Sequence, residues 1–138
     1  MKTPEYTGIR FKHFIPGILW FFLILILICL PQSKVPDIEI WWIELIKPDK
    51  FIHAAMFGIQ QLLLILPYKM NKAASDTIRR KTLFFGILVV LWGLTTELIQ
   101  LQIPGRSFEW MDWLADSVGV ILVVLYFFRK EKKNLPHH

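Results

Sequence analysis

The chain of 138 residues contains one cysteine, Cys29, which excludes an intrachain disulfide and a metal site built from several thiolates. It also lacks a Walker loop, a glycine-rich dinucleotide turn and a G-x-S-x-G elbow, so no common motif assigns an enzyme class. A net charge of +5 could indicate nucleic acid binding, but the basic residues flank apolar segments and form no continuous patch. We therefore expect no nucleic acid partner.

What the chain has instead is long apolar segments. It is 54% hydrophobic and 14% aromatic, and these residues are gathered in blocks. Each block is near the lower limit of length for a helix that crosses a ~30 Å hydrocarbon core at ~1.5 Å per residue. Strands are excluded because a lipid-facing sheet must close into a barrel, which four short segments cannot do. The predicted spans are about 14–30, 50–66, 83–101 and 112–128.

The sequence thus predicts an all-α fold, an integral membrane four-helix bundle in a single domain over 1–138, ending in a basic tail at 129–138. The first span could instead be a signal peptide, but no small-x-small cleavage pattern follows it. The tryptophans within 38–46 predict a short interfacial segment in the first outer loop. A lid over a lipid-facing site is the alternative for that segment.

The basic residues predict the orientation. They are concentrated before the first span, between the second and third, and after the fourth, and the positive-inside rule places these three segments in the cytoplasm. Both termini are then cytoplasmic. The residues concerned are Lys2, Arg10, Lys12, Lys69, Lys72, Arg79, Arg80, Lys81, Arg129, Lys130, Lys132 and Lys133.

Most ionisable residues within the spans fall at the opposite, outer end. Their spacing of three or four residues places them on shared helix faces: His53 follows Asp49 by four, Gln100 follows Glu97 by three and Asp116 follows Asp112 by four. On the third span, Gly86 and Gly93 continue the face of Glu97, and such small residues let helices approach closely in lipid. Because charge inside lipid is costly, these residues are expected to face the bundle interior and to mark a working site.

The residue types suggest acid–base chemistry. His53 can transfer protons because imidazole titrates near neutral pH, and Glu97, Asp112 and Asp116 can activate water or share a proton; these four are the candidate catalytic residues. Lys50 and Arg106 can hold a phosphate or carboxylate. With Asp49 and Gln100 they form the candidate substrate-binding set. The carboxylates and His53 could also hold magnesium, calcium or manganese, but the sequence assigns no metal ligand and leaves any cofactor unknown.

Three other interpretations stay open. A buried ion-pair network, with Lys50 paired to Glu97 or Asp112 and Arg106 to Asp116, could fix helix register without any activity. The protein could instead bind or flip a lipid or drug, although the absence of an inverted repeat argues mildly against transport. It could also be an accessory subunit that docks a larger membrane or envelope complex. Membrane lipids are the expected partners in every case.

The polar residues also carry a resemblance to a family. The order Asp49-Lys50-x-x-His53, Glu97-x-x-Gln100, Arg106 and Asp112-x-x-x-Asp116-x-x-Gly119 resembles the VanZ family over about 48–125. The family is named after a protein of glycopeptide-resistance clusters that is associated with low-level teicoplanin resistance. The resemblance implies a multi-pass protein of a bacterial inner (cytoplasmic) membrane that acts on the cell envelope. Asp116 stands where many members have asparagine, which puts in doubt any role that depends on a neutral amide there.

Overall fold

The computed structural model describes residues 8–30 and 48–132, and within them every regular element is a helix. A 3₁₀ turn, η1 (Phe11–Phe14), leads into α1 (Ile15–Ile28), followed by α3 (Pro48–Met70), α4 (Ser75–Gln100) and α5 (Trp110–Lys132). Four helices, counting η1 with α1, are long and apolar enough to span a membrane. Within the described residues, the predicted all-α class is therefore confirmed, as is the prediction of four helices capable of crossing a membrane. The predicted interfacial segment at 38–46 lies outside the described residues.

The helices extend beyond the predicted spans, mostly at the end where α3 meets α4. There α3 continues through Pro67 to Met70, and α4 already begins at Ser75. At the same end α5 continues to Lys132, so the start of the predicted basic tail is helical. The predicted spans end at the first lysine or arginine because they are based on the apolar residues alone. The helices themselves continue past those residues, because long basic side chains can reach water from a helix end.

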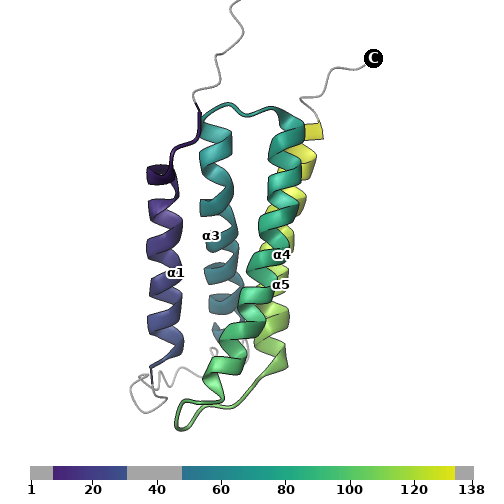
Figure 1. Cartoon of the computed structure of the whole chain (residues 1–138). Helices are drawn as coiled ribbons and strands as arrows, with labels where there is room; N and C mark the ends of the chain where they lie inside the picture. The colour runs from purple at the N-terminus through teal and green to yellow at the C-terminus, as the bar shows by residue number, and fades with distance from the viewer. Residues whose placement is uncertain (1–7, 31–47, 133–138) are drawn as a thin grey trace, which may run out of the picture.

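Successive helices run in alternating directions, so α1 begins and α5 ends at the same end of the bundle (Figure 1). Helices α3, α4 and α5 pack closely on one another, while α1 lies against α3 and buries only Gly17, Ile24 and Ile28. Hydrogen bonds from side chains fasten α1: the Trp20 indole N–H donates to the Met56 carbonyl at 2.9 Å. The site described below is consequently built by α3, α4 and α5.

The bundle has the polarity expected in lipid. Large apolar side chains such as Leu19, Phe84 and Leu122 are exposed on its outer surface. Polar side chains such as Gln61 and Thr82 are buried inside, where the Gln61 amide donates to the Thr82 carbonyl at 2.8 Å. Association of helices in lipid depends on close packing and interhelical hydrogen bonds rather than on apolar burial. The interior can therefore hold many polar groups, and the functional site is one part of that interior.

Helices α3 and α5 approach each other closely at Gly119. A Cβ atom on Gly119 would overlap the carbonyl of Ala54, and one on Gly58 would lie 3.2 Å from the Gly119 carbonyl oxygen. Ala54 and Gly58 are four residues apart on α3, so small residues form a continuous strip at the crossing. This crossing lies beside His53 and one turn from Asp116, and it determines how near those two side chains come.

Candidate functional site

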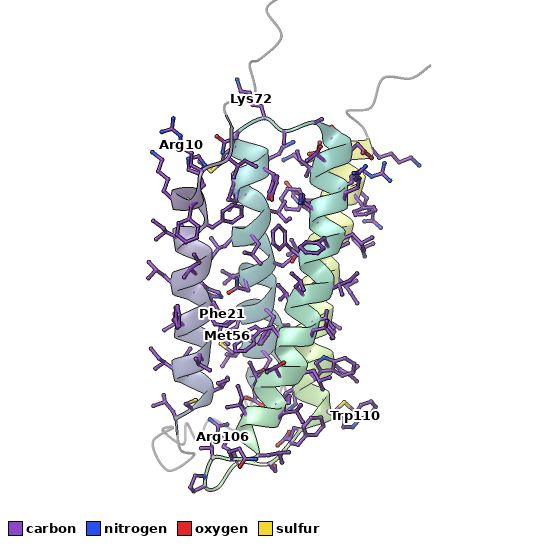
Figure 2. The ribbon with its side chains drawn as sticks, viewed as in Figure 1. Arg10, Phe21, Met56, Lys72, Arg106 and Trp110 are labelled. Atoms are coloured by element: carbon purple, nitrogen blue, oxygen red, sulfur yellow. The ribbon has the colours of Figure 1, made fainter. Side chains whose placement is uncertain are left out.

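Ionisable side chains from three helices converge at the end of the bundle where α3 and α5 begin and α4 ends. Figure 2 shows Arg106 and Trp110 at this end and Arg10 and Lys72 at the other. Four of the converging side chains are buried and the fifth, that of Lys50, is partly exposed. We call this set the acid–base cluster: Lys50 and His53 from α3, Glu97 from α4, and Asp112 and Asp116 from α5.

Lys50 forms the outer edge of the acid–base cluster. Its ammonium group makes a direct ion pair with the buried carboxylate of Asp112. It also lies 3.0 Å from Glu109 Oε2 and 3.4 Å from Asp49 Oδ2, both on exposed side chains. Since Asp112 is the deepest of the three partners, Lys50 offsets a buried negative charge that would otherwise be very costly.

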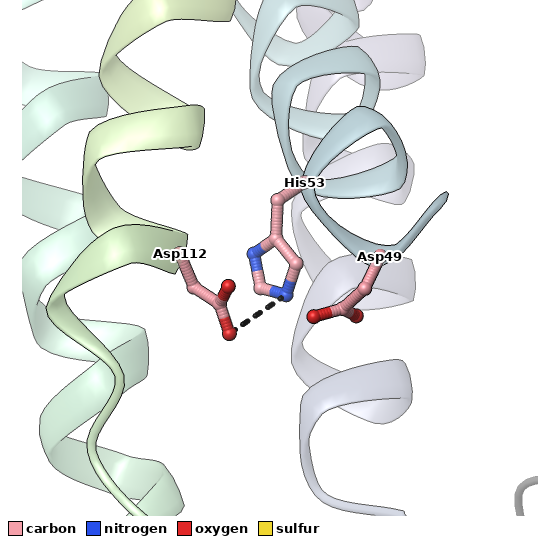
Figure 3. A group of neighbouring side chains, drawn as sticks. All are labelled: Asp49, His53 and Asp112. Atoms are coloured by element: carbon pink, nitrogen blue, oxygen red, sulfur yellow. Dashed lines mark ion pairs between the residues drawn. The ribbon is translucent and has the colours of Figure 1, made fainter. Parts of the chain in front are cut away.

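His53 lies between two carboxylates of α5. Its Nδ1 is 3.0 Å from Asp116 Oδ1, and its Nε2 is 3.7 Å from Asp112 Oδ2. Figure 3 shows the ring in the gap between α3 and α5, with Asp112 on one side and Asp49 on the other. The four-residue spacing of Asp112 and Asp116 places one carboxylate beside each ring nitrogen. The imidazole is thereby fixed in position by both of them.

Asp116 is completely buried, and α4 makes room for it. A Cβ atom at Gly93 would lie 3.1 Å from Asp116 Oδ2 and 3.4 Å from the ring of Phe57, so a larger residue would crowd this carboxylate. Oδ1 contacts His53, but Oδ2 has no hydrogen-bond partner. Buried polar atoms in folded proteins are nearly always paired, so this oxygen requires an explanation.

Glu97 shows the same combination of burial and incomplete pairing. It is completely buried at the last turn of α4. Its Oε2 accepts a hydrogen bond from the backbone N–H of Glu109 at 3.0 Å, which fastens the start of α5 to α4. Its Oε1 has no hydrogen-bond partner. The predicted inward face of α4 is confirmed, because Gly86, Gly93 and Gln100 are buried with Glu97.

Three other predicted site residues lie at the periphery. Gln100 is buried one turn beyond Glu97, but in the described part of the chain its side chain makes no hydrogen bond to the acid–base cluster. Arg106 donates from Nε and Nη2 to the Leu30 carbonyl at 3.4 and 3.5 Å. The considered Arg106–Asp116 ion pair is wrong, because Asp116 lies deeper in the bundle and contacts His53 instead. Asp49 is exposed beside Lys50.

Glu109 is a residue that the sequence analysis missed. Its carboxylate pairs with Lys50, its backbone N–H donates to Glu97, and its carbonyl accepts from the Asp112 N–H at 2.8 Å. The available signal was its position, three residues before Asp112 and directly before α5, where acidic residues favour a helix start. The loop of residues 104–109 therefore contributes directly to the arrangement of the carboxylates.

A second buried carboxylate, also missed, lies at the opposite end of the bundle. Glu131 of α5 contacts the Lys69 ammonium at 2.5 Å and accepts a hydrogen bond from the Ser75 hydroxyl at 2.7 Å. These bonds join the ends of α3 and α5 to the start of α4. Both oxygens of Glu131 are paired, so this carboxylate serves to hold the three helices together. Glu97 and Asp116 differ from it, because each has one oxygen without a hydrogen-bond partner.

Chemically, the acid–base cluster offers one imidazole, three buried carboxylates and one partly exposed ammonium. Such groups can transfer protons or hold a cation. No protein-family model, curated protein or solved structure matches this chain. The argument for function therefore depends on the geometry of the cluster.

Proposed function

We propose that this chain is a multi-pass protein of a bacterial cytoplasmic membrane whose acid–base cluster, at the outer end, binds and acts on the polar part of a lipid-linked or cell-envelope substrate. The orientation is supported by the basic residues at the other end, such as Lys72 and Arg80, under the positive-inside rule. The resemblance to the VanZ family favours an envelope substrate.

The observation that carries this proposal is the incomplete pairing of the two deepest carboxylates. Glu97 and Asp116 are each completely buried, yet each has an oxygen without a hydrogen-bond partner. Leaving such a group unpaired costs about 1–3 kcal/mol. Other described side chains (Gln60, Gln61, Arg79 and Trp92) also have an unpaired buried atom, but Glu97 and Asp116 are the carboxylates among them, in contrast to the fully paired Glu131 at the other end. Buried polar groups that are held in place but left unpaired are typical of sites that bind a substrate and react with it.

The chemistry that these residues support best is acid–base catalysis on a substrate headgroup. His53, Glu97, Asp112 and Asp116 are the groups that can move a proton. At the outer edge of the acid–base cluster, Lys50 pairs with the exposed acids Asp49 and Glu109 as well as with Asp112. An anionic headgroup can replace the two exposed acids on Lys50 without leaving Asp112 unpaired. Asp49 lies beside Lys50, Arg106 is at the same end of the bundle, and Gln100 is buried one turn beyond Glu97.

A second candidate is a non-enzymatic subunit in which the acid–base cluster only fixes helix register or holds a lipid or drug. It is favoured by the direct Lys50–Asp112 ion pair and by the Glu97–Glu109 hydrogen bond, since both join elements that are distant in sequence. Breaking a buried ion pair by removing one partner is strongly destabilising. This candidate therefore predicts a loss of stability rather than of ligand binding.

The test uses purified protein in detergent with polyprenyl phosphate as the probe and neutral polyprenol as its uncharged counterpart. Polyprenyl phosphate is expected to raise the melting temperature of the wild type, and polyprenol is not. Glu97→Gln and His53→Ala should remove the response while the unliganded protein still melts cooperatively. Asp76→Asn is the matched control, because it changes an exposed carboxylate at the opposite end of the bundle.

The opposite result would support the structural candidate. In that case Glu97→Gln and His53→Ala lower the melting temperature of the unliganded protein by several degrees, and polyprenyl phosphate has no effect on the wild type. A response to polyprenol equal to that of the phosphate would show binding by the apolar chain alone. It would contradict the assignment of the headgroup to the acid–base cluster.

A further inference from the structure

Within the acid–base cluster, His53, Glu97 and Asp116 form a compact inner group. Each can offer one ligand atom such that all three atoms lie within 4.8 Å of one another. Their exposed fractions are 7%, 0% and 0%, so the group is closed off from bulk water. The residues come from α3, α4 and α5, one from each, and a small ligand bound among them would contact all three helices.

The unpaired oxygens belong to this same inner group. Glu97 Oε1 and Asp116 Oδ2 are both buried without a hydrogen-bond donor, and they come from facing helices. Sharing a proton could satisfy one of the two oxygens. A bound cation could satisfy both, because carboxylate oxygens are preferred ligands of divalent metals.

The spacing at His53, a hydrogen bond in this structure, also matches that of two ligands on one metal ion. Ligand atoms about 2.1 Å from a metal, at octahedral or tetrahedral angles, lie about 3.0–3.4 Å apart. His53 Nδ1 and Asp116 Oδ1 are 3.0 Å apart. The other ring nitrogen, Nε2, lies 3.7 Å from Asp112 Oδ2. Metal-binding histidines usually direct their second nitrogen at a carboxylate, which fixes the ring and its tautomer.

Charge balance favours a cation as well. The buried part of the acid–base cluster has three carboxylates, Glu97, Asp112 and Asp116, against the ammonium of Lys50. When all three carboxylates are ionised and the imidazole is neutral, two negative charges remain in a region of low dielectric, where uncompensated charge is costly. We propose that His53 Nδ1, Glu97 and Asp116 bind one divalent cation, with Asp112 orienting the imidazole and Lys50 holding Asp112 in place.

The donor set determines the type of cation. One imidazole nitrogen with two carboxylates suits manganese or zinc, whereas magnesium and calcium prefer oxygen ligands alone. Three protein ligands also leave coordination positions open for water or for an oxygen of a substrate. Binding of the ion does not depend on the proposed function, but its use on an anionic headgroup would rest on it.

The experiment is a Mn²⁺ titration of the full chain in detergent after removal of metals with EDTA. Loss of the free Mn²⁺ signal in electron paramagnetic resonance measures binding. The wild type should bind one Mn²⁺ per chain, and Glu97→Gln and Asp116→Asn should each weaken binding at least tenfold. Asp76→Asn, the matched control on an exposed carboxylate at the opposite end of the bundle, should change it less than twofold.

A second measurement on the wild type covers the case in which a variant does not fold. Histidine labelled with ¹⁵N should produce a single nitrogen coupling to bound Mn²⁺ in electron spin echo spectra. Absence of that coupling, or of Mn²⁺ binding by the wild type, overturns the proposal. So does binding that is abolished by Asp49→Asn and retained in Glu97→Gln, because the ion would then occupy the Asp49–His53–Asp112 group instead.

Failure of this inference is distinguishable from failure of the proposed function. If the wild type binds no Mn²⁺ but Glu97→Gln still removes the response to polyprenyl phosphate, the substrate site stands and the metal site falls. If Mn²⁺ binds as expected but polyprenyl phosphate has no effect, the metal site stands and the proposed substrate falls.

Discussion

Replacing Gly119 with alanine should separate α3 from α5 and open the acid–base cluster. The added methyl group would overlap the Ala54 carbonyl, so the helices must move apart by on the order of 1 Å to reach ordinary contact. Overpacking of this kind costs about 1–3 kcal/mol. The same movement stretches the 3.0 Å contact between His53 and Asp116 beyond hydrogen-bond range, at a cost of about 1.5–3 kcal/mol. Allowing for partial relaxation, we expect a total loss of about 2–4 kcal/mol.

The assay is reversible unfolding by sodium dodecyl sulfate in mixed micelles, which gives the free energy of unfolding of each variant. Gly17→Ala is the matched control, because its Cβ would meet Leu64 at an ordinary 3.5 Å, and Gly58→Ala should fall between the two with its contact of 3.2 Å. Equal stability of Gly119→Ala, Gly17→Ala and the wild type would refute the reasoning, since the helix crossing would not then depend on the missing side chain.

Lys50→Met should destabilise the protein strongly, and adding Asp112→Asn should partly restore its stability. A double-mutant cycle should give a coupling energy of about 1–3 kcal/mol between the two residues. Additive effects would show that the ion pair is unimportant. In a cysteine-free background, a cysteine at Gly105 should react with an impermeant thiol reagent on whole cells (outer membrane permitting) and one at Ala74 should not; reversed labelling would invert the topology. Glu131→Gln should lower the free energy of unfolding by about 1–2 kcal/mol. The affinity for Mn²⁺ should stay within twofold of the wild type, because Glu131 and its partners Lys69 and Ser75 lie at the opposite end of the bundle from the acid–base cluster. A large loss of Mn²⁺ binding would mean that the two ends are coupled.

The sequence anticipated most of the acid–base cluster because of helical spacing within lipid. Asp112 and Asp116 are four residues apart in an apolar segment, so both had to face the interior, and the same argument applied to Glu97 among the glycines of α4. Helical spacing gave no information on Arg106, which lies in a loop where no helical period fixes the side chain. It bonds the Leu30 carbonyl, a contact between segments 76 residues apart that no local pattern encodes.

The partners of each charge were also undetermined. Lys50 could have paired with Glu97 of α4 or with Asp112 of α5. The choice depends on which of these helices lies nearer to Lys50, and the sequence does not show that. The structure pairs Lys50 with Asp112, and the backbone N–H of Glu109 bonds Glu97. Glu131 was overlooked because it follows two basic residues at a helix end, where a carboxylate usually meets water. Its burial depends on Lys69 and Ser75 from other helices.

The sequence by itself determined the class of structure, because four long apolar segments in lipid can satisfy their backbone hydrogen bonds only as helices, whatever their neighbours are. It also determined which face of each helix is polar, since periodicity is a local property. Only the tertiary structure decided which polar atoms meet and which remain unpaired. That outcome depends on how closely helices approach, and the approach is set by contacts such as that of Gly119 with Ala54, between residues far apart in the chain.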